Sequence, residues 1–485
     1  MTSFDRFAES AWWVFAAPEI AMLGLICIVL IADLFVDDER RAITFWLSMA
    51  SLGITLWLTL GISTERLVVF DGAYVADPLA QVLKAGAIGF VAIAFLYARD
   101  YLRANNLHKG EFYLLGLFGL LGMMIMISAN SLLTMYLGLE TLALSQYALV
   151  AIDRKNATSA ESAMKYFVLG AIASGALLYG ISWVYGVTGS LEFDQIAAAI
   201  SANPDLNSLP LWFGLAFLIV GIAFKFGGVP FHMWLPDVYE GARSPVTLYI
   251  ASAPKLAALA LTLRILVDGL GGLHDVWADM VMVVAVLSLL VGNVIAIAQS
   301  NIKRMLGYST IAHVGFILLA IFCGTEKGNA AALFYTLTYI VAAAGAFGIV
   351  ILLSRRGYEA ENLSDFKGLN ARSPWFALMM MFLMFSMAGV PPFIGFFGKL
   401  NVIDAVLSSG YPGLAVLMVL ASVVGAYYYL RVVWYMYFEE AEDQAVLQAS
   451  NDTRLVLSLN GVAVLALGIV PGWLWALCTA IFASL

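Results

Sequence analysis

Apolar runs of about twenty residues recur along the whole chain, and they limit its possible folds more than any other feature, because a helix of this length crosses a lipid bilayer. Only 12% of the 485 residues are charged, whereas 62% are hydrophobic. A water-soluble domain carries about twice that share of charged residues. The sequence therefore predicts an all-α polytopic membrane protein.

Hydropathy predicts about fourteen transmembrane segments. The seventh and twelfth are too long for a single crossing and contain Gly and Pro, so we expect both to be discontinuous helices. The segments are expected near residues 16–36, 43–62, 79–98, 112–128, 131–151, 163–187, 211–241, 246–267, 279–299, 304–323, 329–353, 374–408, 413–437 and 455–480.

The interruption "GGVPF" at residues 227–231 has a counterpart, "AGVPP", at residues 388–392. Val229 and Val390 are 161 residues apart, and five segments fill that distance. Five is odd, so the second copy would cross the membrane in the opposite direction. The pattern predicts two inverted five-helix repeats, a design known from secondary transporters. The expected parts are an N-terminal three-helix segment, the two repeats and a C-terminal helix, at 1–110, 111–270, 271–440 and 441–485.

Lys and Arg are concentrated in the connections that follow odd-numbered segments, such as Arg40, Arg41, Arg154 and Lys155. Connections rich in these residues stay in the cytoplasm. Both termini are then expected outside the cytoplasm, because the number of segments is even. The net charge of −8, with no basic stripe, argues against a nucleic-acid partner.

Three lysines lie deep in predicted segments, where an ionisable side chain is costly and usually functional. Lys225 precedes the first interruption and would benefit from the carbonyl end of its half-helix. Lys399 follows the second interruption, where the amide end of a helix would disfavour its charge. Lys255 follows Pro254, which cannot donate to the carbonyl of Ile250. Lysine, unlike arginine, can release and regain a proton when it is buried.

Glu140 is the one carboxylate clearly in the middle of a segment, and we expect it a few ångströms from Lys225 as its counter-charge. A fixed structural ion pair is the alternative. His232 and His313 have side chains suited to relaying protons. A histidine that merely satisfies its hydrogen bonds in the core is the alternative for each.

Lys84, Lys165 and Arg431 lie toward segment ends, and we expect them to extend to the membrane interface. Cys27, Cys323 and Cys478 are far apart and match no zinc or iron–sulfur spacing. We also find no nucleotide-binding or haem motif, so we expect no cofactor on this chain.

Four stretches resemble the antiporter-like membrane subunits of respiratory complex I, the NADH:quinone oxidoreductase, over nearly the whole chain. They are "YLGLETLALSQYALV", "FKFGGVPFHMWLPDVYEGARSPVTLYIASAPK", "NIKRMLGYSTIAHVGF" and "GVPPFIGFFGKLNV". The resemblance implies a polar axis at the membrane midplane formed by Glu140, Lys225, Lys255 and Lys399. The lysine in the twelfth segment is typical of one branch of the family, and another branch has glutamate there.

The resemblance further implies proton translocation driven by electron transfer from NADH to quinone on other subunits. The implied partners are neighbouring antiporter-like and small membrane subunits, the lipid bilayer, and protons with ordered water. The implied location is the bacterial inner membrane, with periplasmic termini. Two alternatives stay open from the sequence: a subunit of an Mrp-type cation/proton antiporter, and a structural spacer whose polar axis is vestigial.

Overall fold

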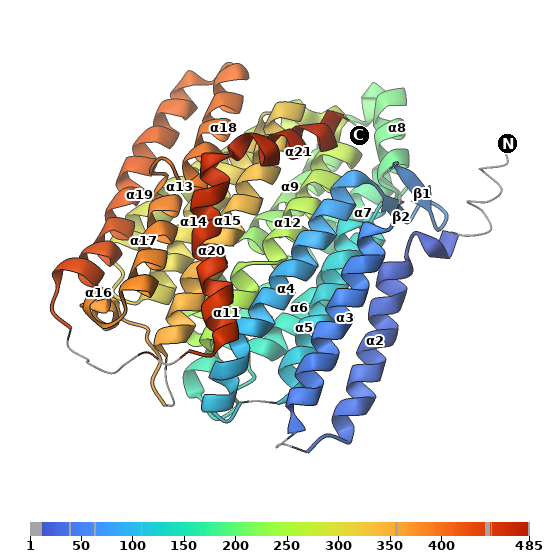
Figure 1. Cartoon of the computed structure of the whole chain (residues 1–485). Coiled ribbons are helices and arrows are strands. Elements are labelled where there is room, and N and C mark those ends of the chain that lie inside the picture. The colour runs from blue at the N-terminus through green and yellow to red at the C-terminus, as the bar shows by residue number, and fades with distance from the viewer. Residues whose placement is uncertain are drawn as a thin grey trace.

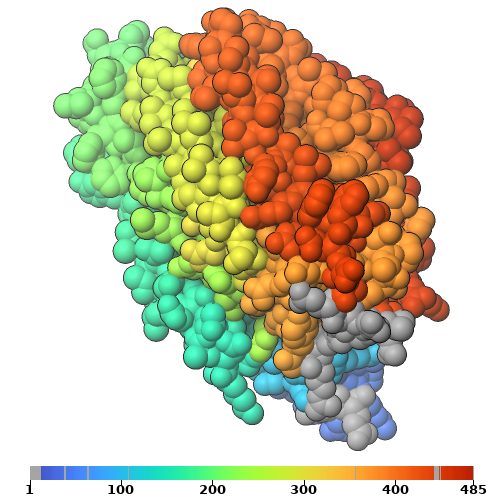
Figure 2. Space-filling view, turned by 90° about the vertical axis from the view of Figure 1, so that its left-hand side faces the viewer, coloured from blue at the N-terminus to red at the C-terminus, as the bar shows by residue number. Residues whose placement is uncertain are grey.

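Long helices lie side by side in the computed structural model, and short elements occupy the ends of the bundle (Figure 1). The structure describes residues 12–37, 40–62, 65–107, 109–354, 357–441, 447 and 449–483. Figure 2 shows α13 (His274–Ile297, yellow) beside α19 (Pro412–Phe438, orange) on one face of the molecule.

The first half of the chain is helical except for a small hairpin. Its two strands, β1 (Leu67–Val69) and β2 (Tyr74–Ala76), pair antiparallel with Leu67 opposite Ala76. The helices are α2 (Ala17–Leu34), α3 (Ala42–Leu60), α4 (Pro78–Ala104), α5 (Gly110–Ile127), α6 (Leu132–Val150), α7 (Ala157–Thr188), α8 (Phe193–Ala202), α9 (Leu209–Phe226), α10 (Trp234–Gly241), α11 (Ser244–Ala251) and α12 (Pro254–Leu263).

The second half begins with a π-helical turn, Arg264–Gly269, that continues α12. After α13 follow α14 (Ile302–Phe322), α15 (Glu326–Leu353), the short α16 (Leu369–Arg372), α17 (Pro374–Ala388), α18 (Ile394–Ser408), α19, α20 (Asn451–Ile469) and α21 (Pro471–Ala483). Single 3₁₀ turns lie at Trp12–Val14, Pro204–Leu206, Gly271–Leu273 and Leu363–Phe366.

Local sequence explains where many of these helices begin. The Asp77 side chain accepts a hydrogen bond from the Ala80 amide at 2.7 Å and caps α4, whose first residue is Pro78. Asn301 caps α14 in the same way by accepting from the Arg304 amide at 3.0 Å. Each of these capping residues lies directly before its helix, so the local sequence is enough to predict the helix start.

Twelve segments of the described residues are long and apolar enough to span a membrane. The central ones are almost completely covered by protein: the apolar window of α14 is 100% buried and that of α15 is 89% buried. The corresponding window of α2, at the edge, is only 28% buried. The hydrophobic core is therefore centred on α14, α15 and the pair α11–α12, with a 94% buried window.

Both predicted interruptions are confirmed. The expected segment 211–241 is divided between α9 and α10, and the expected segment 374–408 between α17 and α18. Gly227 and Gly389 end the first halves with positive φ angles of 83° and 86°, which other residues adopt only with strain.

The prediction of a single helix over 455–480 is wrong. The helix α20 ends at Ile469 and α21 begins at Pro471, and Figure 1 shows α21 (dark red) running across the end of the bundle. Pro471 lacks an amide hydrogen and restricts the residue before it, which ends the first helix.

Lys84 contradicts the expectation that it extends to the membrane interface. Its side chain is 3% exposed and forms an ion pair with Glu19 of α2, with 2.5 Å between Nζ and Oε1. The amine also donates to the Tyr74 hydroxyl at 2.8 Å. The pair joins α2 to α4 inside the protein.

Arg264 is also buried. Its guanidinium is 1% exposed and pairs with Asp77 at 2.7 Å and with Asp268 at 2.9 Å. By contrast, Lys165 lies at the surface with Glu161, and Arg431 donates to the carbonyls of Ile297 and Gln299 near the end of α13.

We expect Glu19→Ala to destabilise the fold by about 3–5 kcal/mol, because it leaves the Lys84 ammonium buried without its anion. The measurement is thermal unfolding of the purified protein in detergent. Replacing both Glu19 and Lys84 by Met is the matched control and should restore most of the loss. If Glu19→Ala were as stable as the unmodified protein, the ion pair between Glu19 and Lys84 would not stabilise the fold.

Candidate functional site

Lys225 lies in the last turn of α9 and is 8% exposed. Its amine donates to the Oε1 atom of Gln146 on α6 at 3.3 Å. The same oxygen accepts from the Tyr166 hydroxyl on α7 at 2.9 Å. The amine thus binds an uncharged oxygen that two helices hold in place.

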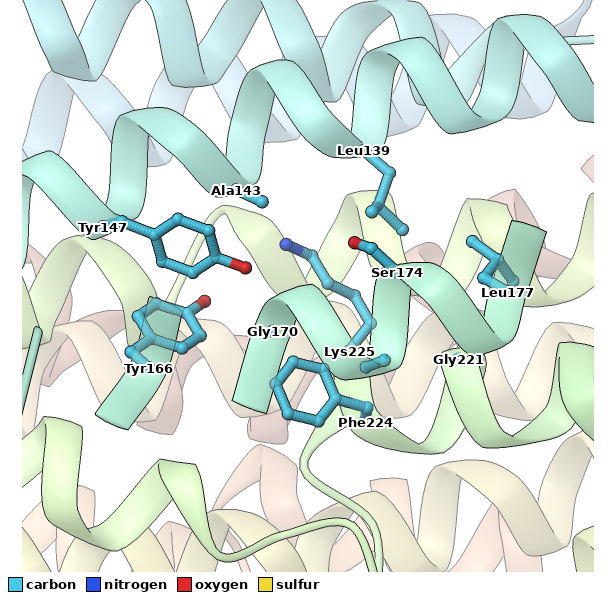
Figure 3. Close-up of a pocket in the computed structure, with 11 residues that line it drawn as sticks. Leu139, Ala143, Tyr147, Tyr166, Gly170, Ser174, Leu177, Gly221, Phe224 and Lys225 are labelled. Carbon is cyan, nitrogen blue, oxygen red and sulfur yellow. The ribbon is translucent and has the colours of Figure 1, made fainter. Parts of the chain in front are cut away.

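A cavity opens beside this amine between α6, α7 and α9, with about 320 Å³ of space including its mouth. In Figure 3 the amine lies between the hydroxyl groups of Tyr147 and Ser174. Much of this space is the open mouth, and the enclosed part has room for about one water molecule.

Glu140 is not the direct partner that the sequence suggested for Lys225. Its carboxylate accepts a short hydrogen bond from the Ser174 hydroxyl. Glu140 is close enough to Lys225 to act on it electrostatically, but no ion pair of 4.0 Å or less between them occurs among the described residues. Ser174 therefore connects Glu140 to the cavity that Lys225 lines.

Lys255 is in the first turn of α12, directly after the interruption between α11 and α12. It is 2% exposed, and its amine donates to the carbonyl of Phe226 at 3.0 Å. That carbonyl belongs to the last residue of α9, next to Lys225. The Lys255 amine thus lies at the end of α9, where the first interruption begins.

Lys399 lies in the second turn of α18, as expected, but its charge does not lie at the amide end of that helix. The side chain extends back across the interruption, and its amine donates to the carbonyl of Ala388 at 2.9 Å. Ala388 is the last residue of α17, so the ammonium lies at a carbonyl end that favours positive charge. The sequence predicts that the amide end of a helix disfavours the charge of Lys399. That expectation is wrong, because the side chain extends to a carbonyl end instead.

His313 of α14 is buried and hydrogen-bonded through both ring nitrogens. Nδ1 lies 2.7 Å from the Tyr335 hydroxyl, and Nε2 lies 2.9 Å from the Tyr429 hydroxyl. His313 and Lys399 line one small cavity with Ser386 and Tyr335, with about 250 Å³ of space including its mouth. The sequence indicated the histidine and the lysine but gave no reason to select these tyrosines.

His232 lies on the connection between α9 and α10, half-buried. Its Nδ1 atom is buried without a hydrogen-bond partner in the described part of the chain. Among the described residues, no hydrogen bond or ion pair joins His232 to Lys225, Lys255 or Lys399. The structure therefore places His232 near the first interruption but outside the hydrogen bonds described above.

Ion pairs of a residue in the first turn of α10 hold this half-helix in position. Asp237 pairs with Lys165 of α7 at 3.0 Å and with Arg304 of α14 at 2.8 Å. Trp234, at the start of α10, stacks on Tyr166 with 4.4 Å between ring centroids. Lys255 lies 5.9 Å from the centre of the Trp234 ring, so α10 connects the surroundings of both lysines.

The arrangement suits proton transfer. The amines of Lys225, Lys255 and Lys399 each have an uncharged acceptor, and two of them line cavities with hydroxyl groups. Among the described residues, no group of three or more His, Cys, Asp or Glu side chains could hold a metal ion.

Comparison with known proteins identifies the family. Residues 129–425 match the model of the NADH:quinone oxidoreductase/Mrp antiporter membrane family. NADH-quinone oxidoreductase subunit N of Thioalkalivibrio sulfidiphilus is 56% identical over 464 residues, which cover 95% of this chain and 96% of the relative. The chain belongs to the N-subunit family of NADH-quinone oxidoreductase. The resemblance deduced from the four sequence stretches is confirmed.

Solved structures agree with an N-subunit fold. A chain of respiratory complex I from Thermus thermophilus matches with a TM-score of 0.81 and 30% identity, over 95% of this chain and 98% of that one. A chain of the Mrp complex from Dietzia sp. matches with a TM-score of 0.85 but only 19% identity, over 97% of both chains. At this low identity, the match to the Mrp chain shows a shared fold and nothing more.

We expect Gly227→Ala to destabilise this N subunit by about 1–2 kcal/mol, because alanine resists the left-handed conformation that Gly227 adopts. The added carbon would also clash with the Leu235 side chain. The measurement is the temperature at which half of the purified protein unfolds in detergent.

Gly186→Ala is the matched control, since nothing lies within 4 Å of its added carbon. It should leave that temperature unchanged or raise it slightly, because Gly186 lies inside α7 and alanine favours a helix more than glycine does. If Gly227→Ala and Gly186→Ala unfold at the same temperature, the role of Gly227 in ending α9 is contradicted.

Proposed function

We propose that this chain is the N subunit of a bacterial proton-translocating NADH:quinone oxidoreductase, and that protons cross the membrane through it. In this proposal the redox reaction takes place on other subunits of the complex, and this chain binds no cofactor. Support comes from the identity with N subunits over 95% of the chain and from the polar groups buried between its helices.

The proposed path uses Glu140, Lys225, Lys255 and Lys399, with His232 and His313 as relays. The observation that carries it is the hydrogen bond of each lysine to an uncharged oxygen, at 3.3, 3.0 and 2.9 Å. Such an acceptor satisfies the ammonium without neutralising it, so the amine can give up its proton to water. A carboxylate partner would hold the proton instead.

We further propose fourteen membrane crossings with two inverted five-helix repeats. Support comes from the matching interruptions after Gly227 and Gly389, and from two helix pairs with close crossings. A carbon added at Gly122 would lie 2.5 Å from the Leu142 amide, where α5 crosses α6, and one at Gly292 would lie 2.6 Å from the Ala312 amide, where α13 crosses α14. In the proposed topology both termini are periplasmic and the membrane is the inner membrane.

Water would reach Lys255 from the cytoplasm, and the proton would leave toward the periplasm through the half of the chain that contains Lys399. Moving one charge against 100 mV costs about 2.3 kcal/mol. This chain must therefore be driven by its partners, which we propose to be the neighbouring antiporter-like and small membrane subunits of the complex.

We expect Lys225→Ala to abolish proton pumping while the complex still assembles, because it removes the amine that exchanges the proton. The measurement is the number of protons translocated per electron in proteoliposomes that contain the purified complex. A normal ratio in this variant would contradict the proposal and would favour a structural spacer.

We expect the chain to purify with a large assembly that contains flavin and iron–sulfur clusters. The measurement is the absorption and electron paramagnetic resonance spectrum of material isolated through a tag on this chain. Isolation with Mrp-type subunits and without flavin would instead identify a cation/proton antiporter.

A further inference from the structure

Gln146 is a polar side chain in an otherwise apolar stretch of α6, and it is 1% exposed. An amide buried among apolar helices is costly unless its hydrogen bonds are satisfied. Its Oε1 atom is satisfied twice, by Lys225 and by Tyr166. Its Nε2 atom is buried and has no partner in the described part of the chain.

The orientation of this amide follows from the charge beside it. If the oxygen and nitrogen were exchanged, the amide hydrogens would face the ammonium of Lys225, which can only donate. The amide is therefore held with its oxygen toward the amine. Tyr166, which reinforces this orientation, is itself fixed by stacking on Trp234.

Two acceptors of different charge lie on the same helix near the amine. Gln146 binds it directly, and Glu140 lies beyond Ser174, which lines the same cavity. The other ionisable groups near the amine are Tyr147 and Tyr166, which line that cavity, and Lys255, whose acceptor is the carbonyl of the residue after Lys225. Glu140 is thus the only acid among these groups in the described part of the chain.

We propose that Gln146 is a positioning residue that keeps the amine of Lys225 on an uncharged acceptor and away from Glu140. On Gln146 the amine passes a proton to water in the cavity and becomes neutral. When Glu140 approaches, the neutral amine takes up a new proton that reaches the cavity as hydronium, and it is held as an ammonium. This inference rests on the proposed function of Lys225 and adds the partner against which Glu140 competes.

The test is Gln146→Glu, which keeps the shape of the side chain and replaces the uncharged acceptor by a carboxylate. Protons per electron are measured with the purified complex in proteoliposomes between pH 6 and pH 9. Because hydrogen bonds to charged groups are strong, we expect the number of protons per electron to fall about tenfold at pH 7. Because the carboxylate holds the proton, pumping should recover only at a pH higher by about one unit or more.

Ser145→Ala is the matched control on the same helix. Its hydroxyl donates to the carbonyl of Thr141, one turn earlier, so this variant should retain the ratio and the pH profile of the unmodified complex. Lys225→Ala separates the proposed function of the chain from the role of Gln146. Normal pumping in Lys225→Ala overturns the proposed function itself.

If pumping is lost in Lys225→Ala while Gln146→Glu pumps with an unchanged ratio and pH profile, the role of Gln146 is wrong and the proposed function stands. If Gln146→Glu lowers the number of protons per electron equally at every pH, the substitution has only disturbed the packing, and the role of Gln146 is again wrong. If Gln146→Glu does not assemble, Gln146→Leu decides by the same readout. Without the amide the amine turns to Glu140, so the profile should again move to higher pH, and an unchanged profile overturns the inference.

Discussion

The hydrogen bond between a lysine ammonium and the carbonyl end of an interrupted helix is the interaction on which this structure depends. A carbonyl without a donor is costly at membrane depth, and so is a buried ammonium. Lys255 and the Phe226 carbonyl satisfy one another, as do Lys399 and the Ala388 carbonyl. Each interruption therefore stabilises a charge, and each charge stabilises an interruption. Because these acceptors are uncharged, the proton on each lysine is not held by an anion.

The sequence predicts the helices and interruptions well, because both depend on local chemistry. Apolar length gives the helices, and the Gly-Gly-Val-Pro and Ala-Gly-Val-Pro stretches give the breaks that Gly227 and Gly389 create. The exception is the kink at Pro471, which a long apolar run conceals. The depth of Lys225, Lys255 and Lys399 in their segments was also predictable, since charges in apolar segments are rare.

The partners of those lysines were not predictable, because helices distant in the sequence supply them. Gln146 lies 79 residues before Lys225, and nothing in the local pattern joins the two. Lys84 was misjudged for the same reason, since its acid, Glu19, belongs to another helix. Lys399 was placed correctly in its helix, but the direction of a long flexible side chain does not follow from the backbone. The likeness of the fold to a chain of an Mrp complex also means that fold alone does not define the reaction.

The most direct test of the account is a cryo-electron microscopy map of the whole complex in a lipid nanodisc, at a resolution that shows ordered water. The account predicts a continuous chain of water and polar side chains from Lys225 through Lys255 to Lys399. Dry, tightly packed apolar side chains between these three amines would contradict it.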